Sequence, residues 1–313
     1  MKSALTKLAS AILQFAYWPI CRAYVKLIIR DKPADSFLAL LCGMQFITVH
    51  KYWPNFRFPR RFSEKVWNRM LYDRDPRLTL ISDKLKVRDY VADRLGKNYL
   101  IPLLWQGDSP EDIPYEKLPD RFVIKTNHGC GYVILVNDKN RIDKEQVRKI
   151  LGKWLKENFG RDTYMGIAWG YNNITPVVMI ESFLGEAAKA PIDYKFYCFG
   201  GQVEFATLHF DRFGEHQTRT YDRKFLPHEF RYDFDHWAGE FSRPLNYEEM
   251  VHLAETLAGE FDFIRVDLYS VGNIIFFGEL TPYPGGVNTK FLPARQDIIL
   301  GEKWSKKISV KVT

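Results

Sequence analysis

The chain is poor in cysteine, and the little it has supports neither a metal site nor a redox centre. Its four cysteines lie far apart among 313 residues, and no two of them form a Cys-x-x-Cys pair: Cys21, Cys42, Cys130 and Cys198. Zinc sites and dithiol motifs need closely spaced thiols. We therefore expect four free thiols, as in a protein of the reducing cytosol.

Long hydrophobic runs are also missing. The apolar stretch at residues 3–20 is interrupted by Lys7, Gln14 and Pro19, and the stretch at residues 37–49 has only 13 residues. A membrane-spanning helix needs about 20 consecutive apolar residues. No spanning helix is therefore expected.

The N-terminal stretch nevertheless has the pattern of an amphipathic helix. Leu5, Leu8 and Ile12 recur at helical spacing, with basic residues beside them. One interpretation is a helix that lies on a membrane surface, which would place a cytoplasmic protein at the inner face of the membrane. The other is a helix that packs on its own domain. Both interpretations predict that residues 1–50 are largely helical.

Internal repeats, low-complexity tracts, a Walker A motif and a dinucleotide fingerprint are absent as well. The composition is 46% hydrophobic and 15% aromatic, which is enough for a large core in two domains or in one domain with a subdomain. The net charge of +7 and the pI near 9.0 favour anionic partners such as nucleotides, acidic glycans or anionic lipid. Lys and Arg do not form runs, so nucleic acid is not expected as a partner.

The order of helical and strand patterns indicates an α+β protein. The first part is predicted to contain a helix at 62–72 capped by Ser63, a helix at 83–95 ending at Gly96, and a strand at 100–105. Later strands are predicted at 121–125, 132–136, 177–183, 194–199 and 202–211, and later helices at 143–159 and 247–261. A proline-containing stretch near residue 115 suggests a boundary. The predicted units are residues 1–50, 51–120 and 121–300.

The most informative stretch is residues 265–286. It has the pattern of two strands joined by Gly272 and Asn273, a strong hairpin signal. Asp267 and Glu279 lie at the ends of the two apolar runs. Two carboxylates on adjacent strands suit Mg²⁺, which prefers oxygen ligands and takes phosphates and water as its others. The alternative is an ordinary hairpin with two solvated acids.

A lysine and a glycine loop form a second candidate site. Lys125 ends a strand immediately before the loop, and another strand follows. A lysine there meets a phosphate as a point charge. Gly129 and Gly131 allow backbone N–H groups to fold over a phosphate chain. The alternative is a tight hairpin with an exposed lysine.

Two further strands carry residues suited to a nucleotide. The first leads into Glu181, Phe183 and Leu184, and an apolar strand that leaves the core offers a slot for adenine. A plain core strand is the alternative. Asp193 and Lys195 share one face of the second strand. They either hold ribose and phosphate or form a surface salt bridge.

Charged residues outside these strands are candidates too. Lys84 begins a basic helix, for which a solvated face is the alternative. Asp211, Arg212 and Arg219 follow a predicted strand. A loop rich in arginine suits a carboxylate substrate, because the guanidinium group matches a carboxylate at two atoms. A plain polar loop is the alternative.

Taken in order, these parts resemble the TupA-like ATP-grasp family, which is named for teichuronopeptide biosynthesis and belongs to the ATP-grasp carboxylate–amine ligases. The shared motifs span roughly residues 50–285. They are Tyr52-Trp53-Pro54-Asn55, Phe62-Ser63-Glu64-Lys65, Leu71-Tyr72-Asp73-Arg74, Asp83-Lys84, Lys125-x-Asn127-His128-Gly129, Asp193-Tyr194-Lys195-Phe196, Asp211-Arg212, Tyr221-Asp222, Arg265-Val266-Asp267-Leu268-Tyr269 and Gly278-Glu279-Leu280-Thr281. The resemblance implies an ATP-grasp fold, in which two α+β subdomains clasp ATP, preceded by a helical N-terminal region.

The resemblance also implies a set of residues that bind ATP. The phosphates would be held and covered by Lys84, Lys125, Lys195, Gly129 and Gly131. The adenine slot would be lined by Glu181, Phe183 and Leu184, and the ribose would be faced by Asp193.

The remaining implied roles concern Mg²⁺ and the reaction. Asp267 and Glu279 would ligate the metal. Many ATP-grasp ligases carry Asn two residues after the second acid, whereas this chain has Thr281, which offers a single oxygen as a third ligand. Arg265 would stabilise the developing oxyanion, with Lys195 as a second catalytic residue. The substrate-binding residues would be Asp211, Arg212 and Arg219.

The implied reaction joins a carboxylate to an amine. The carboxylate attacks the γ-phosphate of ATP to give an acylphosphate and ADP, and the amine then attacks the acyl carbon. The family's association with acidic surface glycans suggests an amino acid joined to a uronic acid of a polysaccharide or its precursor. The alternatives are a glycosyltransferase, for which Asp233-x-Asp235 is a weak candidate for the acidic pair, an ATP-dependent sugar kinase, and a non-catalytic protein of the membrane surface.

Overall fold

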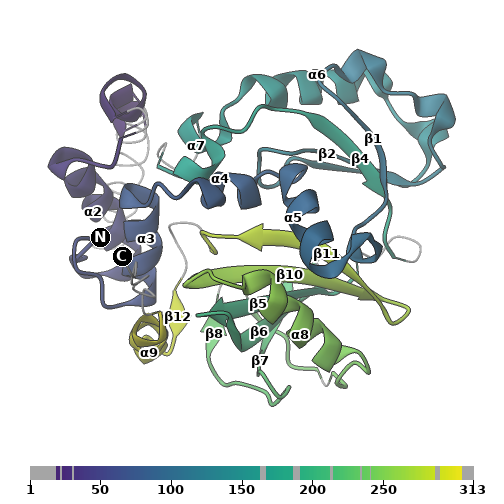
Figure 1. Cartoon of the computed structure of the whole chain (residues 1–313). Coiled ribbons are helices and arrows are strands. Elements are labelled where there is room, and N and C mark those ends of the chain that lie inside the picture. Colours follow the sequence, from purple (N-terminus) through teal and green to yellow (C-terminus); the bar gives the residue numbers. More distant parts are fainter. Residues whose placement is uncertain are drawn as a thin grey trace, which may run out of the picture.

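Two sheets, antiparallel except for one parallel edge pair in the larger, lie one above the other in Figure 1 and form the body of the protein. The structure is a computed structural model that describes residues 19–21, 23–29, 32–162, 167–185, 191–211, 214–232, 235–239, 241–285 and 290–304. Helices α4 (Pro76–Ser82) and α5 (Lys86–Leu95) lie between the two sheets. Helices α2 (Ser36–His50) and α3 (Phe62–Tyr72) lie to one side of both.

The N-terminal region is helical where it is described. The π-helical turn η1 (Val25–Ile29) precedes α2, which begins where the carboxylate of Asp35 accepts a hydrogen bond from the Leu38 backbone N–H at 2.9 Å. The predicted amphipathic pattern falls on residues 1–18, outside the described residues. No helix in the described part of the chain is long and apolar enough to cross a bilayer.

The small sheet has four strands in the order β1-β4-β2-β3. They are β1 (Leu103–Gly107), β2 (Phe122–Thr126), β3 (Val133–Val136) and β4 (Val178–Ser182). Helix α6 (Lys144–Lys156) supplies Val147 and Leu151 to a core shared with Phe122 and Ile180 of the sheet. Because β1 precedes residue 120 and pairs with β4, the sheet crosses the boundary predicted there. The division into units stays a prediction.

The large sheet has six strands in the order β11-β10-β5-β6-β7-β9. They are β5 (Asp193–Phe199), β6 (Gln202–Phe210), β7 (Gln217–Asp222), β9 (Asp235–His236), β10 (Phe263–Val271) and β11 (Ile274–Thr281). Helix α8 (Tyr247–Ala258) shares a core with Tyr194, Phe196 and Cys198 of β5. Since side chains alternate along a strand, Asp193 and Lys195 project from the opposite face.

The remaining elements are η2 (Lys97–Tyr99), η3 (Pro110–Asp112), η4 (Tyr115–Lys117), η5 (Lys139–Arg141), α7 (Phe159–Asp162), η7 (Trp169–Tyr171), β8 (Arg231–Tyr232), β12 (Phe291–Leu292) and α9 (Arg295–Lys303). Of these, α9 and η7 contact α3, whereas η2 contacts α5 and η3 contacts α6. The ring of Phe62 in α3 lies 5.0 Å from that of Phe263 in β10 and 5.4 Å from that of Trp304 after α9. This aromatic cluster fixes the helical region to the first residues of β10.

Most predicted elements are present, with two kinds of error. Ser63 does not cap α3: Arg61 occupies the cap position, and the Ser63 hydroxyl donates instead to Asp297 of α9 at 2.7 Å. A serine that has a distant carboxylate partner is not available to the helix end. Elements without a strong local pattern, among them α4, β7 and α9, were not predicted. The pattern of the β7 segment predicts a polar loop, whereas the structure has a strand there.

None of the four cysteines forms a disulfide in the structure; Cys21, Cys42 and Cys198 are buried and Cys130 is exposed.

Candidate active site

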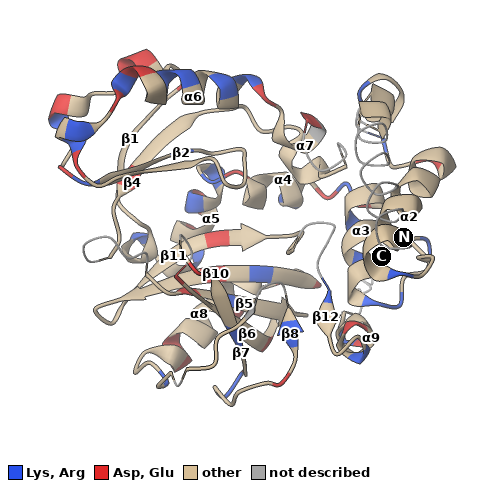
Figure 2. Ribbon diagram, turned by 180° about the vertical axis from the view of Figure 1, so that it is seen from behind, with Lys and Arg blue, Asp and Glu red and all other residues tan. Residues whose placement is uncertain are grey.

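Three charged residues lie side by side across three strands of the large sheet. Asp267 of β10 is the direct cross-strand partner of Glu279 of β11 on one side and of Lys195 of β5 on the other. Directly paired residues of neighbouring strands project to the same face. The hairpin predicted at Gly272 and Asn273 produces this arrangement, since Val271 pairs with Ile274 and both turn residues have positive φ. Figure 2 shows the acidic and basic residues of β10 and β11.

A β-bulge at Gly278 brings Glu279 into this row. The register between β10 and β11 shifts between Asp267 and Leu268, so that Leu268 pairs with Phe277 and Gly278 has no partner. A Cβ atom at Gly278 would lie 3.0 Å from the carbonyl oxygen of Asp267 and 2.9 Å from the Tyr269 ring. Bulges of this kind redirect side chains next to functional sites.

Asp267 is enclosed by two cations. Lys195 Nζ lies 2.6 Å from Asp267 Oδ2, and Arg265 donates from Nε to Oδ1 at 2.6 Å and from Nη2 to Oδ2 at 2.7 Å. Lys195 also lies 2.5 Å from Asp193 on its own strand. Burial alone would raise the pKa of Asp267, but the positive charges of Arg265 and Lys195 outweigh it and hold that pKa below its usual value. Asp267 is therefore an ionised carboxylate.

Glu279 and Thr281 continue the same face along β11. Arg265 Nη2 donates to the Thr281 hydroxyl at 2.9 Å, and that hydroxyl donates to Glu279. Burial opposes the negative charge of Glu279, but the neighbouring Lys84 and Arg265 lower its pKa overall. Thr281 thus orients both Arg265 and Glu279, and its proposed role as a metal ligand stays a prediction.

Lys84 connects the two sheets. It lies between α4 and α5, and its ammonium group donates to the carbonyl oxygen of Gly129 in the glycine loop of the small sheet. Burial lowers the pKa of Lys84, against the attraction of Glu279 in the large sheet. Lys84 is therefore placed between the glycine loop and Glu279 of the row.

The glycine loop is anchored at its base. The backbone N–H of Lys84 donates to the Asn127 carbonyl at 3.0 Å, and the Asn127 side chain donates to Asp83 at 3.0 Å. A Cβ atom at Gly129 would lie 2.2 Å from the Tyr132 ring, and Gly131 has a φ of +79°. Both glycines are needed for this loop conformation.

Lys125 has a partner that the sequence did not reveal. Its ammonium group lies 2.5 Å from Glu181 Oε2, and Arg88 of α5 donates to Glu181 Oε1 at 2.9 Å. The Glu181 carboxylate is therefore neutralised by two cations. If Glu181 lies beside adenine as predicted, its backbone is the part left to contact the base. Phe183, the next candidate for the slot, is half-buried, and the Arg121 guanidinium lies 4.1 Å from its ring centre. Leu184 is half-buried as well.

The predicted substrate residues are not brought to the row. Asp211 is exposed and accepts a hydrogen bond from the Glu215 backbone N–H at 3.0 Å within a turn. Arg212 lies outside the described residues. Arg219 pairs across the sheet with Leu208, whose side chain is in the core shared with α8, and its guanidinium contacts His236. Their roles with substrate stay predictions.

Four further polar residues extend the site along the large sheet. Thr207 and His209 of β6 pair with Lys195 and Asp193 of β5, and Thr220 and Thr218 of β7 pair with them in turn. All four are at least 95% buried, and His209 contacts Thr207 at 3.2 Å and His216 at 2.9 Å. A period-two pattern of polar residues in β6 and β7 is the signal that would have revealed this polar face.

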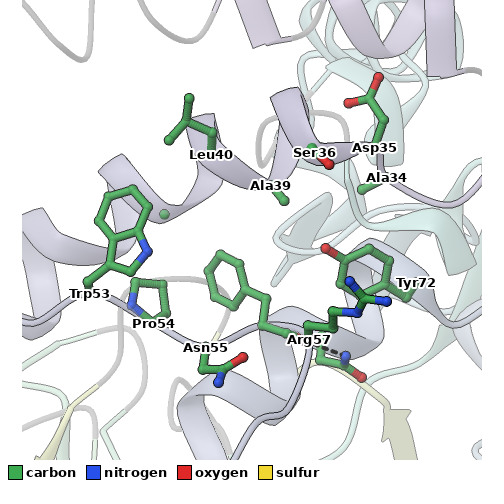
Figure 3. A pocket seen from close by; sticks show the side chains of 13 residues that line it. Ala34, Asp35, Ser36, Ala39, Leu40, Trp53, Pro54, Asn55, Arg57 and Tyr72 are labelled. Atoms are coloured by element: carbon green, nitrogen blue, oxygen red, sulfur yellow. Dashed lines mark hydrogen bonds between the residues drawn. The ribbon is translucent and has the colours of Figure 1, made fainter.

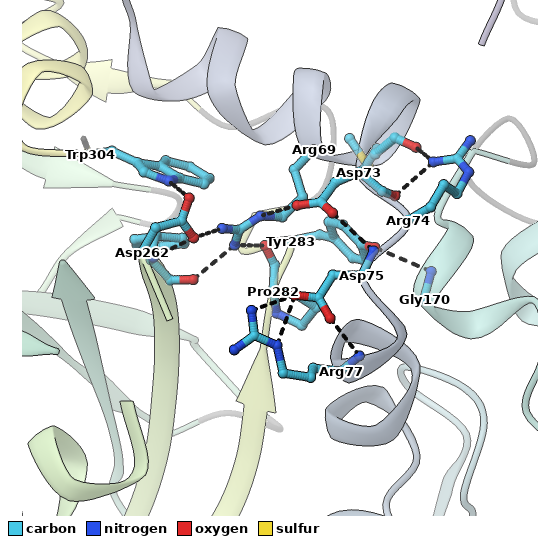
Figure 4. Close-up of polar contacts among 12 residues, drawn as sticks. Arg69, Asp73, Arg74, Asp75, Arg77, Gly170, Asp262, Pro282, Tyr283 and Trp304 are labelled. Carbon is cyan, nitrogen blue, oxygen red and sulfur yellow. Dashed lines mark hydrogen bonds and ion pairs between the residues drawn. The ribbon is translucent and has the colours of Figure 1, made fainter. Parts of the chain in front are cut away.

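Arg69 fixes the ends of the two site strands from α3. It is 4% exposed, donates to the carbonyl oxygens of Phe263 at 2.8 Å and Pro282 at 3.3 Å, and pairs with Asp262 (Figure 4). Phe263 precedes Arg265 by two residues, and Pro282 directly follows Thr281. One buried guanidinium therefore holds both strands in register beside the site.

The residues present fit a divalent hard cation that arrives with a nucleotide. Asp267 and Glu279 offer carboxylate oxygens from one face, which is the donor type that Mg²⁺ prefers. Within the described ranges, no cluster of three or more His, Cys, Asp or Glu side chains is suited to hold a metal. Two carboxylates leave positions for phosphate oxygens and water, as Mg²⁺ sites at nucleotides commonly do.

Comparison with solved structures finds ATP-grasp enzymes at low identity. The ATP-grasp ligase PsnB, solved with a phosphomimetic variant of its minimal precursor, Mg and ADP, has 13% identity and a TM-score of 0.40 over 74% of this chain. D-alanine–D-alanine ligase from Bacillus anthracis, solved with ATP, has 15% identity and a TM-score of 0.38 over 66%. A RimK domain ATP-grasp protein from Sphaerobacter thermophilus has 12% identity and a TM-score of 0.42 over 72% of this chain and 67% of its own. The chain spans 61% of the length of PsnB and 56% of that of the Bacillus anthracis ligase.

Comparison with families gives a direct match, although no curated protein matches the chain. The family model described as TupA-like ATPgrasp matches residues 64–305, more than two thirds of the chain. The two facing α+β layers and the helical N-terminal region are those predicted from the sequence. The chain therefore belongs to the TupA-like ATP-grasp family.

Proposed function

We propose that the protein is an ATP-dependent ligase that joins a carboxylate to an amine through an acylphosphate, releasing ADP and phosphate. The observation that carries this proposal is the row of Glu279, Asp267 and Lys195, with Arg265 beside it. Lys84, which donates to the glycine loop, lies next to this row. This row offers carboxylates for a metal and cations for phosphoryl oxygens on one rigid sheet. Family membership supports the same class of reaction.

In the first step, an oxygen of the substrate carboxylate forms a bond to the γ-phosphorus, and the bond from that phosphorus to the bridging oxygen of ADP breaks. Asp267 and Glu279 would hold Mg²⁺, which neutralises phosphate charge when it is bound. Lys125, Lys84 and Lys195 would position the phosphates as point charges. In the second step, the amine attacks the acyl carbon and phosphate leaves with one oxygen of the original carboxylate. Arg265 would stabilise the oxyanion that develops there.

The substrates we propose are an amino acid and a uronic acid of a surface polysaccharide or its precursor. The resemblance given above suggests this pair, and the net charge of +7 is compatible with an acidic glycan. Asp211, Arg212 and Arg219 stay the residues we propose for substrate binding, with the two arginines for its carboxylate. The reaction would take place in the cytoplasm. If the precursor is lipid-linked, it would take place at the inner face of the membrane.

Labelled oxygen tests the reaction class. The acid is supplied with ¹⁸O in its carboxylate, together with ATP and a panel of amines, and the released phosphate is analysed by mass spectrometry. A ligase transfers one ¹⁸O atom to phosphate only when both acid and amine are present. A sugar kinase releases ADP without phosphate, a glycosyltransferase consumes a nucleotide sugar instead, and a binding protein turns over nothing. Each of these three results contradicts the proposal.

Lys125→Met is expected to weaken ATP binding roughly 10- to 100-fold, the effect of losing one charge-assisted hydrogen bond. The fold should persist because Arg88 still neutralises Glu181. Calorimetric titration with ATP and Mg²⁺ measures the affinity. Lys149→Met, at an exposed lysine of α6, is the matched control and should bind ATP as the wild type does. Equal affinity for the two variants would remove Lys125 from the site.

His209→Gln is expected to slow amide formation at least about tenfold while leaving acylphosphate formation intact, because the amine arrives as an ammonium ion and needs a proton acceptor. His209 faces the row and contacts His216, which reaches the half-exposed edge of the sheet. Hydroxylamine, which is weakly basic and reaches the site uncharged, traps the acylphosphate as a hydroxamate without this help. Equal loss of hydroxamate and amide would show that His209 only supports the fold of the site.

A further inference from the structure

The positive charge of the protein is concentrated at its N-terminal end. Residues 1–72 contain twelve Lys and Arg against three Asp and Glu, a net charge of +9, whereas the remaining residues carry −2. The ligase site lies almost entirely in the second part. A reaction on acidic substrates therefore does not account for the net positive charge of the first part, which arises because acids are scarce there.

A groove opens on this basic part of the molecule. It has a volume of about 990 Å³ and is lined by Ala39 and Leu40 of α2, by Trp53 and Arg57 of the segment that follows, and by Tyr72 of α3 (Figure 3). A second hollow of about 490 Å³ shares Arg57 with the first. Two of the residues that line it are Arg60 and Lys65. The two hollows also share Asn68, and the second is lined by Asp73 and Asp262 beside its basic residues.

Large apolar side chains on this surface are exposed to solvent. Leu40 of α2 is 49% exposed, Trp53 55% and Phe58 70%. Helix α2 also exposes Phe37 and Met44. Aromatic residues with cations between them are typical of proteins that lie in the interfacial layer of a bilayer. Along the sequence, Arg57 lies between Trp53 and Phe58, and Arg60 follows Phe58. Aromatic and basic side chains therefore alternate in this segment.

The acids nearby do not neutralise the arginines of this surface. Asp35 accepts hydrogen bonds from the Leu38 backbone and from Tyr24. Asp262 and Asp73 lie beside Arg69. Neither Arg57 nor Arg60 forms an ion pair with a carboxylate of the described residues. Their charges are therefore directed at solvent or at an external anion.

We propose that the surface formed by α2 and residues 53–60 docks the protein onto an anionic lipid bilayer. Trp53, Phe58 and Leu40 would enter the interfacial layer while Arg57 and Arg60 meet lipid phosphates. The surface lies to the side of the two sheets in Figure 1. The docking does not depend on the ligase reaction, but it would bring that site to an acceptor held in the same membrane.

Vesicle co-sedimentation of the full chain, without nucleotide, tests the proposal. Vesicles contain phosphatidylcholine alone or with roughly 30% phosphatidylglycerol, at about 0.1 M and 0.5 M salt. The wild type should bind the anionic vesicles and lose most of this binding at high salt. Each arginine near an anionic surface contributes about fivefold, so Arg57→Gln with Arg60→Gln should reduce the partition coefficient roughly 25-fold. Trp53→Ser with Phe58→Ser should reduce it at least about tenfold.

The matched control removes two exposed lysines of α6, far from this surface: Lys149→Gln with Lys153→Gln. It should bind within about twofold of the wild type, since only local charge contacts the lipid. The proposal is overturned if the wild type binds both kinds of vesicle equally, if the arginine pair binds like the wild type, or if the control loses as much. Arginine-dependent binding to soluble polygalacturonate but not to vesicles would also overturn it. ATP turnover of the arginine variant without lipid, expected to be unchanged, separates failure of docking from failure of the ligase.

Discussion

Glu279→Gln is expected to reduce acid-dependent ADP release by about 10³-fold or more, because it removes one of two carboxylates that we assign to Mg²⁺ and such a metal supplies several kcal/mol of charge stabilisation. The substitution keeps the size of the side chain and its contact with Thr281. Asp267, on the adjacent strand, remains held by Arg265 and Lys195, so the fold should be retained. A coupled assay of ADP release over a range of Mg²⁺ concentrations measures the effect.

The matched control is Glu260→Gln, which changes a glutamate whose side chain is 93% exposed. It should have wild-type turnover and wild-type thermal unfolding. If Glu279→Gln also turns over ATP within about threefold of the wild type, the row on the large sheet is not the metal site. If the unfolding temperature of Glu279→Gln falls by many degrees, its turnover cannot be interpreted, and Thr281→Val tests the same site instead. That variant removes the hydroxyl that orients Glu279 and Arg265 while leaving both charges, and it should lower turnover by a smaller factor.

Arg265→Lys is expected to lower the rate of the chemical step about 10²- to 10³-fold while changing the affinity for ATP by no more than about threefold. Lysine keeps the positive charge beside Asp267 but loses the planar fork that contacts Asp267 and Thr281 at three atoms. An oxyanion forms only during the reaction, so the loss should appear in kcat. Single-turnover formation of acylphosphate and amide, together with calorimetric ATP titration, separates the two quantities.

The chain contains a second arginine that is paired at two atoms with a carboxylate, far from the site. Arg223 donates to both oxygens of Glu255 at 2.9 and 3.1 Å, and its side chain is 50% exposed. Arg223→Lys is therefore a control for loss of a fork without loss of charge, and it should have wild-type kcat. A pure loss of ATP affinity in Arg265→Lys, with kcat unchanged, would contradict the role that we assign to Arg265.

Local patterns predicted the parts of the site that lie close together in the sequence. Gly272 and Asn273 favour positive φ, so the hairpin and the pairing of its two strands follow from a few residues. Alternation along a strand placed Asp193 with Lys195 and Arg265 with Asp267. The bulge at Gly278, which brings Glu279 directly opposite Asp267, was not visible, because a glycine within a strand does not reveal which register the pair adopts.

The partners of the predicted residues came from distant elements. Arg88 reaches Glu181 from α5, and Arg69 reaches the ends of β10 and β11 from α3. Neither arginine has a local pattern that separates it from an ordinary residue on a solvated helix face. Ser63 shows the same effect in reverse, because a favourable local cap was replaced by a hydrogen bond to Asp297, more than 200 residues away.

The sequence alone determined the class of fold, the hairpin with its two acids, the lysine before the glycine loop and the family, because each depends on residue types at short, fixed spacings. Only the tertiary structure decided which charges neutralise one another, which polar residues of β6 and β7 join the row, and which basic residues share a surface with the apolar side chains of α2. Those features depend on how β5, β6, β10 and the helices are placed in space. A cation and a carboxylate attract each other according to their distance and burial, and the order of residues along the chain fixes neither.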